Sequence, residues 1–127
     1  MRFFHGTDAQ IAELSAPICL TADRDVALVY AAEAGDVLVY EIEVSDSVLL
    51  ADEDALIAAA DELGYGPSID HGGQRWHSVY ELADDADVQA ALIARGFAGA
   101  RYGDTTPAGV THDTVQLWTP ASVATVV

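Results

Sequence analysis

His5, Gly6 and Thr7 combine an imidazole and a hydroxyl on either side of a glycine near the start of the chain. The aromatic residues before them favour a short strand that ends at His5. An imidazole and a hydroxyl can each hydrogen bond to a ligand, and a glycine lets that ligand approach the backbone closely. The segment therefore predicts a ligand site at the end of a strand.

Two further residues with useful chemistry follow, Thr21 and Tyr30. Thr21 ends a short apolar segment, and Tyr30 lies on or beside the apolar stripe of a helix predicted at 23–34. An aromatic residue at helical spacing is also typical of a core position, so packing on a sheet stays an alternative for Tyr30.

The chain gives no support for a metal site or for several common chemistries. Cys19 is the only cysteine and lies in an apolar run, which predicts a small core residue. His71 and His77 have no cysteine partner, and no zinc-binding spacing is present. Signatures of dinucleotide-binding Rossmann folds, P-loops and serine nucleophile elbows are also missing. Hydride transfer, phosphoryl transfer and serine-based hydrolysis therefore have no support.

The charge balance limits the possible partners. The chain has 21 acidic and 5 basic residues, all of the latter arginine, and a formal charge of −16. This charge repels nucleic-acid backbones and anionic membranes, so we expect no direct contact with either. Salt adaptation of the source organism and attraction of a basic protein partner are two open explanations for the acidity.

Length and patterning indicate one α+β domain over residues 1–127. No apolar run is long enough to span a bilayer and the N-terminus lacks a secretory signal pattern, so we expect a soluble, cytoplasmic protein. Strands outnumber helices with few crossover connections, which favours mainly antiparallel pairing. Strands are expected at 2–5, 18–21, 36–44, 97–102, 110–118 and 122–127, and loops at 64–77 and 103–109. Helices are expected at 8–14, 23–34, 51–63 and 78–95, the last with a break or a fresh helix start at 84–87.

The order of these segments resembles that of a small ADP-ribosyltransferase. The resemblance rests on strands that end in His-Gly-Thr and Leu-Thr, a helix with Tyr-Ala, the strand Val-Tyr-Glu-Ile-Glu-Val, the segment Gly-Phe-x-Gly-x-x-Tyr, and a proline between the last two strands. The chain is similar to the poly(ADP-ribose) polymerase and diphtheria-toxin branch, and to short phage-encoded anti-CRISPR members. This likeness implies a split, mainly antiparallel sheet with short flanking helices, and NAD as substrate.

The resemblance implies a role for each matching residue. His5 would hydrogen bond to the adenosine ribose of NAD, and Gly6 and Thr7 would line the nicotinamide end. Thr21 belongs to the same ordered set, and Tyr30 would stack on the nicotinamide ring. Tyr40 or Tyr102 would supply a second aromatic face. Arg75, in the loop at 64–77, is a candidate for clamping the pyrophosphate or for recognising a target protein.

The catalytic carboxylate is the point at which the chain departs from the pattern. Members of this branch usually have a glutamate near the start of the penultimate strand, and the strand at 110–118 has none. Asp113 is the nearest carboxylate and our first candidate. Counting back from Pro120 places Thr114 in the glutamate position instead, and Asp104 is a second candidate.

Two classes of function follow from the sequence. The first is a mono-ADP-ribosyltransferase that uses His5, Tyr30 and Asp113 to modify a side chain of a basic partner protein, as an anti-defence or toxin-type effector. Nucleic-acid-handling complexes are the basic class that we expect such a partner to come from. An NAD glycohydrolase, with water as the acceptor, is a variant of this class. The second is an acidic binding module that blocks a basic partner without catalysis.

Overall fold

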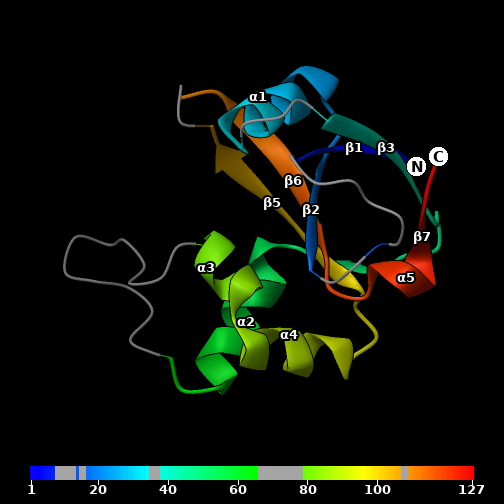
Figure 1. The fold of residues 1–127 in the computed structure, drawn as a ribbon. Helices are drawn as coiled ribbons and strands as arrows, with labels where there is room; N and C mark the ends of the chain where they lie inside the picture. The colour runs from blue at the N-terminus through cyan, green and yellow to red at the C-terminus, as the bar shows by residue number, and fades with distance from the viewer. Residues whose placement is uncertain (8–13, 15–16, 35–37, 66–78, 107–108) are drawn as a thin grey trace.

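The computed structural model describes residues 1–7, 14, 17–34, 38–65, 79–106 and 109–127. Seven strands and five helices make up the described part, in which an α+β fold is built on a mostly antiparallel sheet (Figure 1). The elements are β1 (Arg2–Thr7), β2 (Ile18–Thr21), α1 (Arg24–Ala34), β3 (Leu38–Val44), β4 (Leu50–Ala51), α2 (Glu53–Glu62), α3 (Val79–Asp84), α4 (Ala86–Ile93), β5 (Gly99–Thr105), β6 (Thr111–Leu117), α5 (Pro120–Val123) and β7 (Ala124–Val126).

The strands form one sheet in the order β4-β5-β6-β2-β1-β3-β7. All neighbours are antiparallel except β4 and β5, which are parallel. The β1–β2 ladder consists of the Phe4 and Thr21 pair, whereas β1 pairs with β3 from Arg2 to Thr7. The sheet is therefore weakly joined in its middle, between β1 and β2.

Each face of the sheet has its own core. On one face, Ala100 and Tyr102 of β5 pack with buried residues of α2, α3 and α4. On the other face, Phe3 of β1 and Val115 and Leu117 of β6 pack with residues around β7. We call the first the cavity face and the second the opposite face. Successive residues of a strand point to opposite sides, so Asp104 lies on the cavity face and Asp113 on the opposite face.

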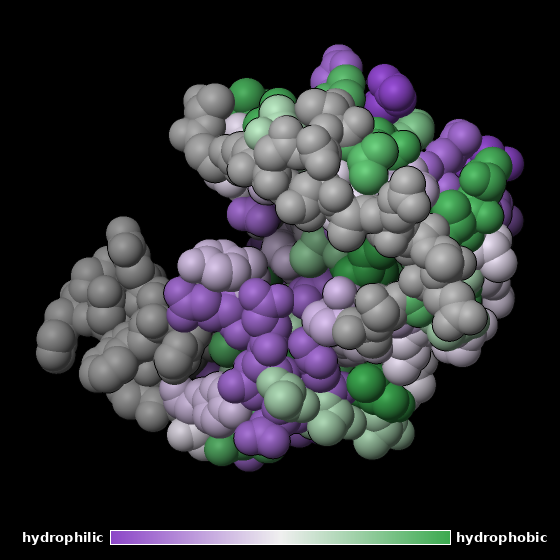
Figure 2. All heavy atoms as spheres, viewed as in Figure 1, coloured by the Kyte–Doolittle hydropathy of each residue, from purple (hydrophilic) through white to green (hydrophobic). Residues whose placement is uncertain are grey.

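Helices cover the cavity face at its two ends and leave a hollow between them. Helix α1 packs against β1 on one side, and α2, α3 and α4 pack against β5 on the other (Figure 1). Figure 2 shows the surface hollowed between these two parts. Side-chain caps fix the helix starts, because the carboxylates of Asp23, Asp52 and Asp85 accept hydrogen bonds from backbone N–H groups of the first turns of α1, α2 and α4.

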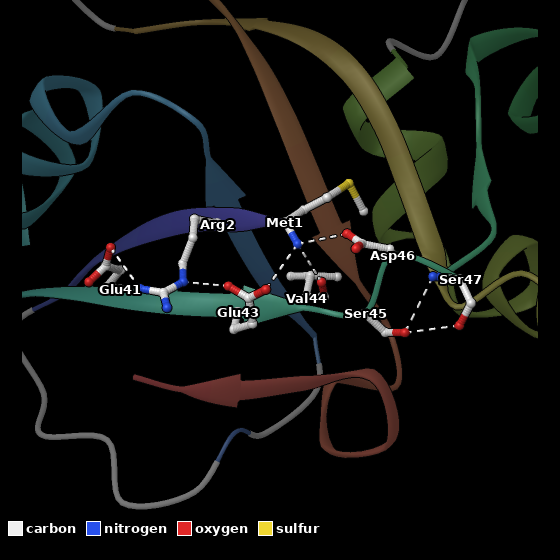
Figure 3. A network of polar contacts seen from close by, with 8 residues as sticks. All are labelled: Met1, Arg2, Glu41, Glu43, Val44, Ser45, Asp46 and Ser47. Atoms are coloured by element: carbon white, nitrogen blue, oxygen red, sulfur yellow. Dashed lines mark hydrogen bonds and ion pairs between the residues drawn. The ribbon is translucent and has the colours of Figure 1, made fainter.

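A charged network joins β1 to β3 near the β3–β7 edge of the sheet (Figure 3). The Arg2 guanidinium contacts the carboxylates of Glu41 and Glu43 on the neighbouring strand. The Met1 ammonium lies 3.2 Å from Glu43 and 3.0 Å from Asp46. These cations hold the pKa of Glu43 below its usual value. The network neutralises part of the acidic surface at this edge.

Most expected elements are confirmed, with a few differences. Strand β1 continues through Thr7, and β5 continues to Thr105, across residues expected to form a loop. Strand β4 was not expected, and the last expected strand begins with the short helix α5. The helix expected at 78–95 is two helices, α3 and α4, separated at the expected break. The expected helix at 8–14 and most of the loop at 64–77 lie outside the described residues.

Candidate functional site

A cavity of about 240 Å³ opens on the cavity face between β1, β2, β5, β6 and α1. It forms where β1 and β2 separate beyond their pairing at Phe4 and Thr21. The polar residues that line it are His5, Thr21, Tyr30, Asp104, His112 and Thr114. The N-terminal elements β1, β2 and α1 and the β5–β6 hairpin near the other end of the chain therefore contribute to one site.

His5 borders the cavity at the gap between β1 and β2, although alternation along β1 places it on the same side of the strand as Phe3 and as its ladder partner Tyr40. Its Nδ1 atom is 2.8 Å from the carbonyl oxygen of Cys19. A carbonyl oxygen can only accept a hydrogen bond, so Nδ1 carries the hydrogen and donates it. The lone pair of Nε2 is then available to accept from a hydroxyl or an amide of a ligand. The imidazole is thus held in one tautomer by the main chain of β2.

Gly6 lines the cavity, and the backbone of helix α1 packs closely against it. A Cβ atom at this position would lie 1.8 Å from the carbonyl oxygen of Ala27 in α1. This contact gives Gly6 a packing role, and the approach of a ligand to its backbone stays a prediction. Glycine is required so that α1 can pack on β1 and form one wall of the cavity.

Tyr30 projects from α1 to the cavity and meets His112 of β6. The Tyr30 hydroxyl is 3.0 Å from His112 Nε2. The two ring centroids are 5.7 Å apart and the ring planes lie at 72°, an edge-to-face arrangement. Tyr30 is therefore in contact with other cavity side chains and does not serve only as helix-to-sheet packing.

Asp104 is the carboxylate that lines the cavity. It lies on β5 directly opposite His112 of β6, on the same face of the sheet. Its Oδ1 atom accepts a hydrogen bond of 2.8 Å from the Thr105 backbone N–H. Among the described residues, the cavity lining contains no arginine. The negative charge of Asp104 therefore faces the cavity without an opposing guanidinium from this part of the chain.

Asp113, the first candidate for the catalytic carboxylate, lies elsewhere. It is exposed on the opposite face, where its Oδ2 is 3.4 Å from Arg101 Nη2. It borders a second, open groove of about 370 Å³, together with the acidic residues Asp52, Glu53 and Asp54 at the start of α2. The structure does not bring Asp113 together with His5 and Tyr30. It does bring Thr114, the residue that the count from Pro120 selected, to the cavity.

Cys19 corrects another expectation, because its side chain is exposed at the cavity and not buried in the core. Alternation explains the difference, since Ile18 and Leu20 point into the opposite-face core and Cys19 points away from it. Desolvation by the surrounding protein, reinforced by the negative charge of Asp84, raises the pKa of the thiol to about 11. The thiol is therefore protonated at neutral pH and is a poor nucleophile.

A buried polar chain lies under the cavity beside Cys19. The Tyr102 hydroxyl donates to Gln116 Oε1 over 3.4 Å, and Gln116 Nε2 donates to Asp84 Oδ1 over 2.7 Å. Burial raises the pKa of Tyr102 well above its usual range, so the phenol stays neutral. Tyr102 is buried, borders the second groove and is not among the residues that line the cavity.

The remaining predicted residues lie away from the cavity or outside the described chain. Tyr40 packs against the opposite-face core. Thr7 ends β1 and is not among the described residues that line the cavity. Arg75 lies outside the described residues. His112 is the residue that the sequence argument missed, although the alternation that places Thr114 on the cavity face also places His112 there.

Two searches of the described residues complete the site. No cluster of three or more His, Cys, Asp or Glu side chains within them is arranged to hold a metal ion. None of the helices in the described ranges is both long and apolar enough to cross a membrane.

Comparisons of the chain with protein-family models, with curated proteins and with solved structures found no match. Function must therefore be argued from the cavity itself.

Proposed function

We propose that the protein is an ADP-ribosyltransferase that uses NAD as substrate and modifies a side chain of a basic partner protein. One observation carries the proposal: the cavity joins His5, Tyr30 and a carboxylate, Asp104. The first two are residues that the resemblance to ADP-ribosyltransferases selects. The third has the charge that such a reaction needs, although it comes from β5 and not from the expected penultimate strand.

The size of the cavity supports binding of one end of the dinucleotide. A volume of about 240 Å³ lies below the roughly 300–1,000 Å³ of typical small-molecule sites. We place the nicotinamide and its ribose, the end that reacts, inside the cavity. The Tyr30 ring would stack on nicotinamide, and His5 Nε2 would accept a hydrogen bond from a ribose hydroxyl.

Asp104 would act on the bond that breaks. In the reaction the C–N bond between the ribose and nicotinamide is cleaved, and nicotinamide leaves with the electron pair. Positive charge then develops on the ribose, where a nearby carboxylate lowers the energy of the transition state. A nucleophilic side chain of the partner forms the new bond to the same carbon and loses its proton. We therefore assign Asp104, and no longer Asp113, as the proposed catalytic carboxylate.

A substitution at His5 tests this proposal. His5→Ala is expected to lower kcat/KM for nicotinamide release from NAD by about 100-fold, because misplacement of the reacting end is costly. Tyr80→Phe is the control, because Tyr80 is exposed on α3 and is not among the residues that line the cavity, so the change should leave turnover within about twofold. Nicotinamide is measured by chromatography, with and without host lysate. If wild-type protein releases none under either condition and binds no NAD, the proposal fails.

The charge distribution favours a second candidate, an acidic binding module that blocks a basic protein. Across residues 52–62 and 79–95, which include α2, α3 and α4, the only basic residue is Arg95, and it contacts Glu62. The acidic residues in these ranges are Asp52, Glu53, Asp54, Asp61, Glu62, Glu81, Asp84, Asp85 and Asp87. Hydrophilic residues cover much of this part of the surface (Figure 2).

Labelled NAD distinguishes the two candidates. A transferase puts the label on a captured basic protein, and Asp104→Asn abolishes labelling while capture persists. A binding module captures its partner at low salt with no label, because exposed charges attract over about 10 Å at ~0.1 M ionic strength. Label found only on free ADP-ribose would instead indicate an NAD glycohydrolase.

A further inference from the structure

His112 is the most closely engaged side chain of the cavity to which the proposed reaction gives no role. Its Nε2 atom is 3.0 Å from the Tyr30 hydroxyl, and its ring meets the Tyr30 ring edge to face. It also lies directly across from Asp104 in the β5–β6 ladder. Its strand is held by pairing with both β5 and β2, whereas Tyr30 lies on a helix that packs on the sheet.

The partners of the His112 ring assign its tautomer. Nδ1 lies 3.3 Å from the carbonyl oxygen of Asp113 and 3.4 Å from Thr114 Oγ1. Because the carbonyl can only accept, the neutral ring carries its hydrogen on Nδ1. The lone pair of Nε2 then accepts a hydrogen bond from the Tyr30 hydroxyl. His5 is held in the same way, with Nδ1 on the carbonyl of Cys19, but its Nε2 is left for a ligand.

We propose that His112 is a positioning residue that fixes Tyr30 at the cavity wall. The hydrogen bond sets the place of the phenol, and the edge-to-face contact sets the tilt of the ring. Both interactions tie α1 to β6 across the cavity. If Tyr30 stacks on nicotinamide, as the proposed function requires, His112 determines how well the ring is presented to NAD. The effect on NAD rests on the proposed function, whereas the contact with Tyr30 does not.

The contact is tested first without NAD. Nitrogen-15 NMR of the full chain at about pH 8, above the ordinary imidazole pKa of about 6.5, distinguishes the two neutral tautomers. We expect the Nδ1–H form for His112, and a changed Nε2 shift in Tyr30→Phe with little change at His5. An Nε2–H tautomer at His112, or an Nε2 shift indifferent to Tyr30→Phe, would overturn the proposal.

A double-mutant cycle then tests the consequence for NAD. His112→Phe keeps an aromatic edge and removes the acceptor, so we expect KM for NAD to rise about three- to tenfold, the range of one neutral hydrogen bond, with kcat within about twofold. In the Tyr30→Phe background the same change should alter KM by less than about twofold. His112→Gln, whose amide oxygen can accept from the phenol, should recover part of the loss.

The outcomes separate this inference from the proposed function. Additive effects of His112→Phe and Tyr30→Phe on KM would mean that His112 does not act through Tyr30, and would refute the positioning role while leaving the transferase intact. Wild-type protein that neither binds nor cleaves NAD would refute the proposed function, and the NMR result would still decide whether His112 holds Tyr30.

Discussion

The two faces of the β5–β6 hairpin carry one aspartate each, and the two differ in every property that matters for chemistry. Asp104 lines the cavity with His5 and Tyr30, and no arginine among the described residues lines it. Asp113 is exposed on the opposite face beside the Arg101 guanidinium. The two carboxylates lie at neighbouring levels of the ladder, since Asp104 pairs with His112 and Asp113 with Gly103.

The difference shows that strand register, and not nearness in the sequence to a family position, decides which carboxylate lines the cavity. Successive residues point to opposite sides of a sheet, so a shift of one residue moves a side chain to the other face. A carboxylate beside an arginine also has less net charge to offer a developing cation. Both arguments favour Asp104.

The largest effect on the free energy of unfolding is expected at Gly6, in the cavity wall, and is compared with a substitution at Gly103 on the opposite face of the β5–β6 hairpin. Gly6→Ala places a Cβ 1.8 Å from the Ala27 carbonyl oxygen, so α1 must move. We expect a loss of at least about 3 kcal/mol in the free energy of unfolding, measured by urea denaturation. Gly103→Ala is the matched control, because the nearest atom to its Cβ is Glu53 Oε1 at 4.0 Å. Equal losses in the two variants would contradict the packing of α1 on Gly6.

The reactivity of Cys19 tests the environment of the cavity. With a pKa of about 11, the folded thiol should be alkylated by iodoacetamide at pH 8 about 100-fold more slowly than in the urea-unfolded chain, whose thiol has a pKa of about 8.5. The rate should rise as pH increases toward the folded pKa, because the thiolate is the reactive form. Similar rates in the folded and unfolded chains at pH 8 would show that the cavity does not raise this pKa.

The smallest effect on stability and on NAD turnover is expected for Arg101→Ala, on the opposite face. Arg101 and Asp113 are both exposed, and exposed ion pairs contribute little because water and salt screen them. Arg101→Ala should change the free energy of unfolding by less than about 1 kcal/mol and leave NAD turnover within about twofold. A loss of turnover of tenfold or more, with stability unchanged, would indicate that the reaction takes place on the opposite face and would contradict our assignment of the cavity.

Much of the fold could be predicted from the sequence because its signals are local. Alternating residues predict β3 and β6, and the four-residue strand β2 is confirmed at the expected positions. The extension of β5 to Thr105 could not be predicted in this way, since Gly103 and Asp104 are typical turn residues and only pairing with β6 makes them a strand. The two-residue strand β4 is too short to show a pattern.

The site could be predicted only in part, for the same reason. His5, Thr21 and Tyr30 follow from residue types near the ends or on the faces of predictable elements, and all three line the cavity. The choice between Asp104 and Asp113 depends on which face of the β5–β6 hairpin borders the cavity, and that is set by β1, β2 and α1, which are distant in the sequence. The exposure of Cys19 and the contact between Tyr30 and His112 likewise depend on which elements meet in space.

The most direct test of the central claim compares Asp104→Asn with Asp113→Asn. Both changes remove one negative charge and keep the size of the side chain, and an asparagine oxygen at 104 can still accept from the Thr105 N–H. We expect Asp104→Asn to lower kcat for nicotinamide release by about 100- to 1,000-fold with NAD affinity within about threefold, and Asp113→Asn to stay within about twofold of wild type. The reverse order, or two variants that both keep wild-type turnover, would contradict the assignment of Asp104 as the catalytic carboxylate.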